Sequence, residues 1–473
     1  MATHGLPSPD PTKAGVPQEG ARPAALLRTA AALLALLVSF ALWLTGIIPD
    51  SWQPFLPSLF ASLLLALYCF LRLPASRPIL TRCLLLYLTV GITLTGADLT
   101  LRVTLRNRFN YRPHDMFIRV WQRLPLLTRY QQNVHYHGQT YGDLAAFSPN
   151  PELQVRRNVE FETDAFGFRN RRQSTRRDEP YDLILLGDSF VAGCGNSQSN
   201  IWSEQLEQRH GLHTYNLGLP GDPGHAYLNL IAESPRLTLR PAAHVVLAIF
   251  TGNDLTQALP EAVENLPLPW QKPSLAFYNS CLDFRNHSSL HRLWERLQLG
   301  RDPLASQLTP DQSGLIVRST PDGQPMLFYR HYTWMLDATE ETAKVDFFAP
   351  DLQKILQHCQ AFCDTRQLQF DVVLIPAKEE ILSWILEYKS PWSGSNEPSL
   401  LGRRLARFCQ QQGIGFLDLK PHFAAASREL YETQQNWLWW PDDSHWNPQG
   451  YRLAADLLQK FLLQPKPEPE QTQ

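Results

Sequence analysis

The chain has 473 residues, of which 44% are hydrophobic and 19% charged, and its 43 Lys and Arg residues nearly balance 45 Asp and Glu residues. This apolar content supports packed domains and excludes a wholly disordered chain. Because nucleic-acid binding needs a clustered cationic face, the formal net charge of -2 argues against it. A mean hydropathy of -0.26 excludes a protein built only from membrane spans.

Apolar residues are concentrated near the amino terminus. Residues 1–23 are rich in Pro and Gly and are expected to be disordered. The following region, residues 24–103, contains three apolar stretches with few charges. Their lengths predict membrane spans at about residues 29–49, 55–71 and 83–103.

The number of spans decides on which side of the membrane the rest of the chain lies. Basic residues precede the first predicted span and follow the second, which places the amino terminus in the cytoplasm. Three spans carry the remaining chain across the membrane, as we expect, whereas two would leave it in the cytoplasm. The two-span alternative stays open because the third stretch runs into Asp98 and Arg102. A cleaved signal peptide is a weaker alternative, since no clear small-residue cleavage site follows the first stretch.

Apolar strand-like runs and amphipathic helical segments alternate over residues 180–463, after a linker and lead-in at residues 104–179. The predicted strands are about residues 181–186, 214–217, 244–250, 370–375 and 415–419. The predicted helices are about residues 201–210, 226–233, 352–365, 400–411 and 448–462. This alternation predicts a parallel, doubly wound sheet with helices on both faces.

An insertion at residues 260–350, rich in Pro, Trp, Tyr and Phe, interrupts the alternation. Such insertions in α/β enzymes form lids over a substrate, but the same aromatic residues can instead form a small core of their own. Both interpretations stay open. Residues 464–473 contain three Pro residues and are expected to form a disordered tail.

Reactive and polar side chains follow the predicted strands or precede the last predicted helix. They lie in four short segments: Gly187-Asp188-Ser189-Phe190, Asn216-Leu217-Gly218-Leu219-Pro220-Gly221, Thr251-Gly252-Asn253-Asp254 and Asp442-Asp443-Ser444-His445. Since ligands of parallel sheets bind at the carboxyl ends of the strands, we expect these segments to come together in one site.

The four segments, in this order along the chain, resemble the signature blocks of the GDSL/SGNH hydrolase superfamily. The blocks centre on Ser, Gly, Asn and His, which here are Ser189, Gly221, Asn253 and His445. The resemblance covers about residues 160–463 and includes Gly167-Phe168-Arg169, similar to the lead-in of membrane-anchored bacterial members. It implies a flavodoxin-like three-layer α/β/α SGNH hydrolase domain. Together with three spans, it implies a multi-pass protein of a bacterial inner membrane with its catalytic domain in the periplasm.

The residue types of these segments suit nucleophilic catalysis. A serine hydroxyl becomes a good nucleophile only when a base removes its proton, and histidine is the side chain whose pKa lies near neutrality. We therefore expect Ser189 to be the nucleophile and His445 its general base. Asp442 lies three positions before His445, a spacing from which a carboxylate can hold the imidazole through its far ring nitrogen. Asp443 is the alternative, although the spacing favours Asp442.

Attack on an acyl carbonyl creates an oxyanion, which needs hydrogen-bond donors already in place. The expected donors are the backbone N–H groups of Ser189 and Gly221 and the Asn253 amide. Gly218 competes with Gly221, which is preferred because the acidic Asp222 follows it, as in the family pattern.

No metal or cofactor site is predicted. His135 and His137 alternate as on a strand or loop, but no third ligand stands at metal-binding spacing. Cys359 and Cys363 lie four positions apart in a predicted helix, where they favour packing over a disulfide or a metal site.

Three functions are compatible with these residues. The preferred one is a membrane-anchored serine esterase that removes an acyl group from a carbohydrate or lipid through an acyl-serine intermediate. The second is an O-acyltransferase that modifies a cell-envelope or exported polysaccharide, for which a membrane partner would supply acyl groups. Pro376-Ala377-Lys378 raises this possibility, because it resembles the Pro-x-Lys turn of polysaccharide O-acetyltransferases. The third is a non-catalytic binding module on the same fold, which the presence of all the reactive residues disfavours.

Overall fold

The computed structural model describes residues 112–123, 126–148, 150–172, 179–254, 314–336, 350–386 and 396–464, together with residues 93, 96, 97, 100 and 101. Apart from Thr93, these residues belong to one compact unit, Leu94–Gln473. The spans predicted at residues 29–49 and 55–71 and most of the span predicted at 83–103 lie outside the described residues, as do residues 1–23 and 465–473. None of the described helices combines the length and the apolar character that crossing a membrane requires.

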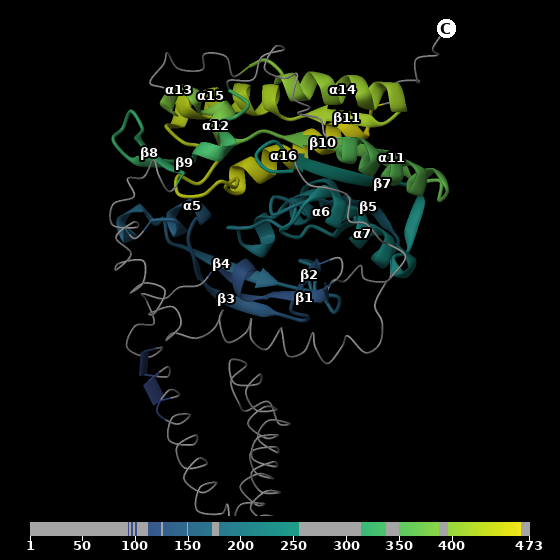
Figure 1. Ribbon diagram of the computed structural model, residues 1–473, viewed down its shortest axis with the longest axis horizontal. Helices are drawn as coiled ribbons and strands as arrows, with labels where there is room; N and C mark the ends of the chain where they lie inside the picture. The colour runs from purple at the N-terminus through teal and green to yellow at the C-terminus, as the bar shows by residue number, and fades with distance from the viewer. Residues whose placement is uncertain are drawn as a thin grey trace, which may run out of the picture. The chain divides into compact units, whose positions relative to one another are not determined.

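A five-stranded parallel sheet forms the centre of the unit (Figure 1). Its strands are β5 (Tyr181–Leu186), β6 (Thr214–Asn216), β7 (Leu239–Phe250), β10 (Gln369–Ile375) and β11 (Gly415–Asp418). They are arranged in the order β11-β10-β7-β5-β6. Numbered along the chain within the sheet, this is the order 2-1-3-4-5 of flavodoxin-like folds, in which the strand order reverses between the first and third strands. The predicted parallel sheet is confirmed, and its switch point lies between β5 and β7.

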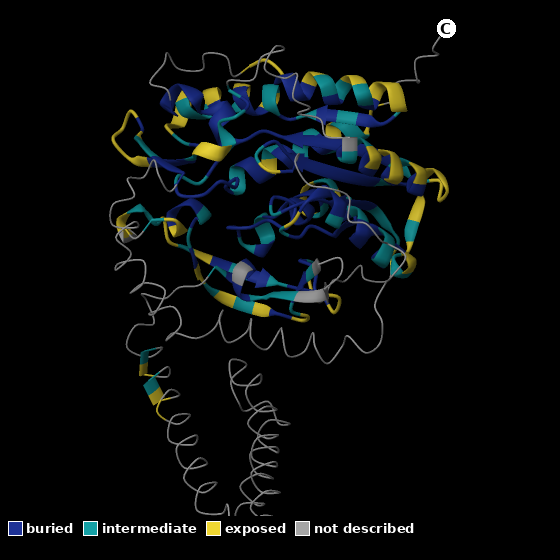
Figure 2. Cartoon of the chain, in the orientation of Figure 1, coloured by how far each residue is buried: buried dark blue, intermediate teal, exposed yellow. Residues whose placement is uncertain are grey.

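Helices cover both faces of this sheet, so the predicted three-layer α/β/α architecture is confirmed. One face packs against α6 (Trp202–His210), α15 (Lys420–Gln434), α16 (Pro448–Leu462) and the short helices α12 (Lys378–Ile381) and α13 (Ser383–Leu386). The other face packs against α7 (Pro223–Glu233), α11 (Pro350–Asp364) and α14 (Leu400–Gln412). Figure 2 shows the central strands as mostly buried, with exposed residues near the start of β7, and the outer surfaces of α11 and α14 as exposed.

The alternation of side chains along β7 explains why two apolar cores form. Val246 and Ala248 join the core on the face of α6 and α16, whereas Val245 and Leu247 join the core on the face of α7 and α11. Successive side chains of a strand point to opposite faces, so an uninterrupted apolar run suits a strand that is buried on both. The apolar runs of the sequence therefore predicted the strands correctly.

The structure also contains elements that the sequence analysis did not predict. In the lead-in these are α4 (Pro113–Met116), β1 (Ile118–Arg123), β2 (Leu126–Tyr130), β3 (His135–Thr140), α5 (Asp143–Ala146) and β4 (Arg157–Glu162). Further along the chain they are β8 (Leu315–Ser319), β9 (Pro325–Tyr329), α12, α13 and α15. Short 3₁₀ turns cover Pro151–Leu153, Gln198–Asn200, Ser234–Arg236 and Arg330–Tyr332. The pairs β1–β2, β3–β4 and β8–β9 are antiparallel hairpins.

The amino-terminal cap of α16 joins the last helix to the loop that carries His445. The Asn447 Oδ1 accepts hydrogen bonds from the N–H groups of Gln449 at 2.9 Å and Gly450 at 3.1 Å, and its Nδ2 donates to the Trp437 carbonyl at 2.6 Å. Loss of such a cap typically costs about 0.5–2 kcal/mol. We expect Asn447→Ala to lower the thermal unfolding midpoint by about 2–4 °C for each kcal/mol lost, measured by circular dichroism.

Asn447→Ser is the matched control, because a serine hydroxyl keeps the capping acceptor and only the bond to Trp437 is lost. Its midpoint should lie between those of the wild type and Asn447→Ala. Equal midpoints for all three proteins would contradict a stabilising cap.

Candidate active site

A tight turn places Ser189 directly after the end of β5. Gly187 has a φ of +152°, and a Cβ on this residue would lie 2.9 Å from the carbonyl oxygen of Ala248, which only glycine avoids. The Asp188 carboxylate accepts a hydrogen bond from the Phe190 N–H at 2.8 Å and faces the Ser189 hydroxyl at 3.5 Å. Asp188 thus braces the turn, and Ser189 stands at the carboxyl end of the sheet.

Arg169 holds the segment that follows Ser189. Its buried guanidinium donates to the carbonyl oxygens of Ala192 at 3.0 Å and Asn196 at 2.5 Å, and also to that of Gly193. Its Nε donates to the Gln198 side chain at 3.2 Å. The Gly-Phe-Arg lead-in therefore satisfies backbone carbonyls that the turn would otherwise leave buried without a donor.

Ser189, His445 and Asp443 form a continuous chain of hydrogen-bonding side chains. The His445 Nε2 lies 2.7 Å from the Ser189 Oγ, and its Nδ1 lies 2.7 Å from the Asp443 Oδ1. The backbone N–H of His445 donates to the same Asp443 oxygen at 3.1 Å. His445 is 4% exposed, so this arrangement is largely shielded from water. A hydroxyl, an imidazole and a carboxylate in this order are the parts of a serine nucleophile with its base.

The prediction that Asp442 holds the His445 ring is wrong, because that carboxylate points to the lead-in instead. The Asp442 Oδ2 accepts from the N–H groups of Gly142 at 2.7 Å and Val155 at 2.8 Å. A Cβ on Gly142 would lie 1.8 Å from the Asp442 carbonyl oxygen, so this close approach requires glycine. Backbone donors from a distant part of the chain thus determine where the Asp442 carboxylate points, although its spacing of three residues from His445 favoured a contact with the ring. The alternative, Asp443, lies next to the ring instead.

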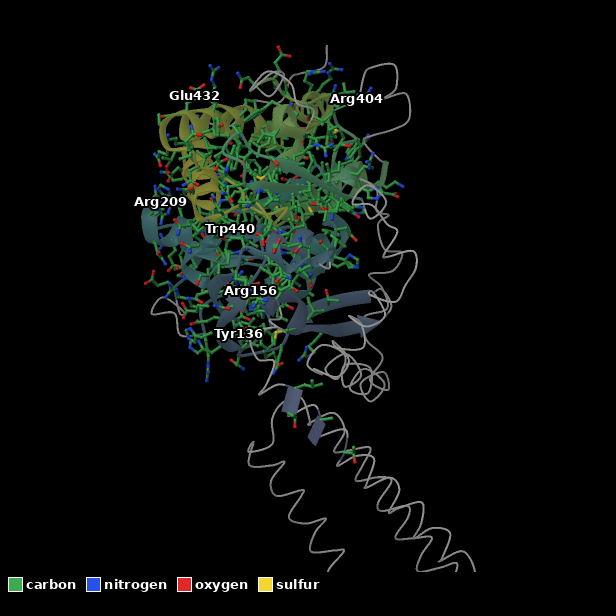
Figure 3. All side chains as sticks on the ribbon, turned by 90° about the vertical axis from the view of Figure 1, so that its left-hand side faces the viewer. Tyr136, Arg156, Arg209, Arg404, Glu432 and Trp440 are labelled. Carbon is green, nitrogen blue, oxygen red and sulfur yellow. The ribbon has the colours of Figure 1, made fainter. Side chains whose placement is uncertain are left out.

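Arg157 of β4 binds both carboxylates of the loop. Its Nη2 lies 2.6 Å from the Asp443 Oδ2 and its Nη1 lies 3.1 Å from the Asp442 Oδ1. The guanidinium also donates to the Gly195 carbonyl at 2.9 Å and stacks 4.3 Å from the centre of the Trp440 ring. Figure 3 labels Trp440 and Arg156, the residue that precedes this arginine in the sequence.

These charges act on the pKa values of both partners. Burial raises the pKa of Asp443, but His445 and Arg157 lower it more, so it lies well below its ordinary value. Burial lowers the pKa of His445, but Asp443 raises it, with further contributions from Asp143 and Asp188, and it lies above its ordinary value. Asp443 is therefore ionised at neutral pH and favours the proton on the Nδ1 of His445, leaving Nε2 to accept a proton from Ser189.

Asp143 of α5 is a second carboxylate near the ring that sequence reasoning missed. Its Oδ2 lies 3.7 Å from the His445 Nδ1, and the carboxylate accepts hydrogen bonds from the backbone N–H of Ser444, at 2.7 Å, and from the Ser444 hydroxyl. Burial and the neighbouring Asp443 raise the pKa of Asp143. No motif marks this residue, since its contacts join positions 301 residues apart.

Lys378, from the Pro-x-Lys turn after β10, supports the same loop from the other side. Its fully buried Nζ donates to the carbonyl oxygens of Asp443 at 2.7 Å, Trp440 at 3.2 Å and Pro441 at 3.4 Å. Burial lowers the pKa of this amine. The sequence marked Lys378 through a family resemblance, and its contacts make it a positioning residue for the loop.

Two of the three expected oxyanion donors, Gly221 and Asn253, lie on the loops after β6 and β7. The Gly218 N–H already donates to the Asn216 Oδ1 at 2.8 Å, which favours Gly221 over Gly218. Gly221 and Asn253 are exposed, and no described residue accepts a hydrogen bond from the Gly221 N–H or the Asn253 amide. These two groups stay predicted donors, with the Ser189 N–H.

Two groups of described side chains are close enough to share a metal ion: Asp143 with Asp443 and His445 at this site, and His135 with His137 and Glu160 on β3 and β4. In the first group the ring of His445 bonds to Asp443, and Ser444 bonds to Asp143. The atoms of this group that could bind a metal ion therefore already take part in hydrogen bonds within the site.

A cavity of about 410 Å³ lies at the opposite end of the sheet, near the starts of β5 and β6. Two of its charged lining residues, Arg171 and Glu204, form an ion pair at 2.6 Å. Since ligands of such sheets bind at the carboxyl ends of the strands, the Ser189 end is the better candidate for the reaction site.

Comparison with known proteins gives matches only among solved structures; no protein-family model and no curated protein matches the chain. One similar structure is a protein of the G-D-S-L family from Desulfitobacterium hafniense DCB-2, with 12% identity and a TM-score of 0.26, covering 59% of this chain and 98% of the other. A second has 14% identity and a TM-score of 0.28, covering 59% of this chain and 94% of the other.

Replacement of Lys378 tests its supporting role. Lys378→Met keeps an unbranched apolar chain but removes three hydrogen bonds, and it leaves the buried Asp443 carbonyl without its donor. We expect a loss of about 1–3 kcal/mol in the free energy of unfolding. We also expect faster hydrogen exchange of the backbone amides of residues 439–446, measured by mass spectrometry.

Lys354→Met is the matched control, since Lys354 is exposed and its contact with Asp351 is a 3.5 Å surface pair. Surface pairs contribute little, so its exchange pattern should match the wild type. Unchanged exchange of residues 439–446 in Lys378→Met would refute the supporting role.

Proposed function

We propose that the chain is a serine hydrolase of the GDSL/SGNH type that cleaves an acyl ester. The observation that carries this proposal is the hydrogen-bonded chain Ser189–His445–Asp443, with two 2.7 Å contacts, at the carboxyl end of β5. The strand order and the positions of the four polar segments support it independently. A non-catalytic binding module would not need this geometry.

The first half of the reaction forms an acyl-enzyme. The Ser189 Oγ attacks the acyl carbonyl carbon while the His445 Nε2 takes the hydroxyl proton, and Asp443 stabilises the resulting imidazolium. His445 then gives the proton to the leaving alkoxide as the ester C–O bond breaks, which releases an alcohol and leaves the acyl group on Ser189.

The second half regenerates the serine. Water attacks the acyl-serine carbonyl, gives its proton to His445, and the free acid leaves as the proton returns to the Ser189 Oγ. Both halves pass through an oxyanion, for which the N–H groups of Ser189 and Gly221 and the Asn253 amide are the proposed donors. Each such donor contributes about 10²–10³ to the rate.

An O-acyltransferase is the alternative, in which a sugar hydroxyl replaces water in the second half. The same acyl-serine serves both reactions, so the nucleophile and base do not separate them. The resemblance around Lys378 raised this alternative, but the contacts of Lys378 with the loop carbonyls explain its presence without an acceptor sugar. We therefore favour hydrolysis of an ester on a carbohydrate or lipid.

The membrane location belongs to the same proposal. We propose that residues 24–103 anchor the enzyme in a bacterial inner membrane, with the hydrolase domain in the periplasm. The support is the apolar, weakly charged composition of that region and the basic residues that flank its first two stretches. A transferase at this location would need a membrane protein as the source of acyl groups.

Labelling with a fluorophosphonate tests the nucleophile. The reagent phosphonylates an activated serine, so the wild-type protein should be labelled, Ser189→Ala should not, and His445→Ala should react at least about 10²-fold more slowly without its general base. The measurement is in-gel fluorescence against time. Equal labelling of the three proteins would exclude the proposed mechanism.

The pH dependence tests the choice of carboxylate. A general base must be unprotonated, so kcat/KM should rise with pH through the pKa of His445, which lies above its ordinary value of 6.5. Asp443→Asn removes the negative charge that raises the pKa of His445 most, so the increase in kcat/KM should occur at lower pH. The rate should also fall, by up to about 10⁴-fold, because the tautomer is no longer fixed.

Asp442→Asn is the matched control. It keeps the contact of Asp443 with the ring, so its kcat/KM should rise over the same pH range as in the wild type, measured with a chromogenic acetyl ester. If Asp442→Asn shifts the rise and Asp443→Asn does not, the assignment from the structure is wrong.

A further inference from the structure

The hairpin β3–β4 brings two histidines and two glutamates together on its exposed face. The strands are antiparallel, with His135 opposite Glu162 and His137 opposite Glu160. Residues two apart on a strand share a face, and directly opposite residues are neighbours across the pair. The four side chains therefore form one cluster.

Three of these side chains bring possible metal-ligand atoms close to one another. The Nε2 atoms of His135 and His137 lie 2.7 Å apart, and the His137 Nε2 lies 3.9 Å from the Glu160 Oε1. One ligand atom from each of the three residues falls within 4.8 Å of the other two. Tetrahedral zinc with bonds of about 2.0–2.1 Å places its ligand atoms about 3.3 Å apart. Small side-chain rotations of His135, His137 and Glu160 would bring their ligand atoms to that separation from one another.

Glu162 supplies the support that metal-binding histidines usually have. Its Oε1 lies 3.1 Å from the Nδ1 of His135, on the side of the ring away from the other ligand atoms. A carboxylate at the far nitrogen fixes the tautomer of a metal-bound histidine and increases its basicity. The arrangement thus has both the ligands and an outer partner.

We propose that His135, His137 and Glu160 form a binding site for a divalent transition-metal ion of the Zn²⁺ class, with Glu162 as outer partner and water completing the coordination. Two imidazoles favour zinc and its neighbours over Mg²⁺ and Ca²⁺, which prefer oxygen ligands. No third ligand for His135 and His137 is recognisable in the sequence, because Glu160 comes from the opposite strand. A bound ion would join the two strands of the hairpin.

Titration calorimetry of the purified full-length protein tests this site. The protein is prepared without a polyhistidine tag, stripped with EDTA and titrated with ZnCl₂ and with MgCl₂ in a non-coordinating buffer. We expect one zinc ion per chain with micromolar or tighter affinity and no comparable binding of magnesium. His135→Ala and His137→Ala should each weaken zinc binding by more than about 10²-fold, and Glu162→Gln by about 10–10²-fold.

Two controls locate the binding. His358→Ala removes an exposed histidine of α11 and should bind zinc as the wild type does. His445→Ala removes the histidine of the other cluster with metal-ligand geometry and should also retain binding. Circular dichroism checks that each variant is folded, including His445→Ala, whose side chain is buried.

Three results would overturn the proposal. These are no zinc binding by the wild type at micromolar concentration, undiminished binding by His137→Ala, and loss of binding in His445→Ala but not in His137→Ala. The last would assign the ion to the Ser189 site. The first two results leave fluorophosphonate labelling of Ser189 unaffected, so the proposed hydrolase function is tested separately.

Discussion

The arrangement of the candidate site depends on the ion pairs between Arg157 and the adjacent carboxylates Asp442 and Asp443. Both carboxylates are buried, and a buried charge without a partner is strongly destabilising. One guanidinium meets both, which fixes the direction in which each side chain points. With Asp442 held by the lead-in, Asp443 is left to orient His445, and through it Ser189.

The loop that carries Asp443 and His445 is held from two sides. Arg157 and Asp143 approach it from the lead-in, and Lys378 binds its carbonyl oxygens from the end of β10. Catalysis by a serine nucleophile requires the base to be in place before the substrate arrives, because reorganisation would cost part of the rate enhancement. The lead-in is thus part of the site rather than a connection to it.

The sequence predicted those features that arise locally. The strands were recognisable as apolar runs, and Ser189 and His445 by residue type and position after or before an element. Asp143 and Arg157 were missed because their contacts join residues 301 and 285 positions apart, for which no local pattern exists. The choice of Asp442 from its spacing was also wrong, because spacing in the sequence gives no information on the distant partners Gly142, Val155 and Arg157. Helix α15 was missed because its buried stripe is narrow, with Phe423, Ala424 and Ser427 its buried residues.

The two faces of β4 separate two kinds of chemistry. Val159 and Phe161 are buried and share a face of β4 with Arg157, which contacts the loop of the Ser189 site. Glu160 and Glu162 lie on the opposite face, together with the two histidines of β3. Adjacent side chains of a strand diverge, so an ion on the outer face has no direct contact with Arg157. Any influence on the buried carboxylates must pass through the backbone of the hairpin. A metal here would therefore act on the stability of the strand that presents Arg157, and leave the charges beside His445 unchanged.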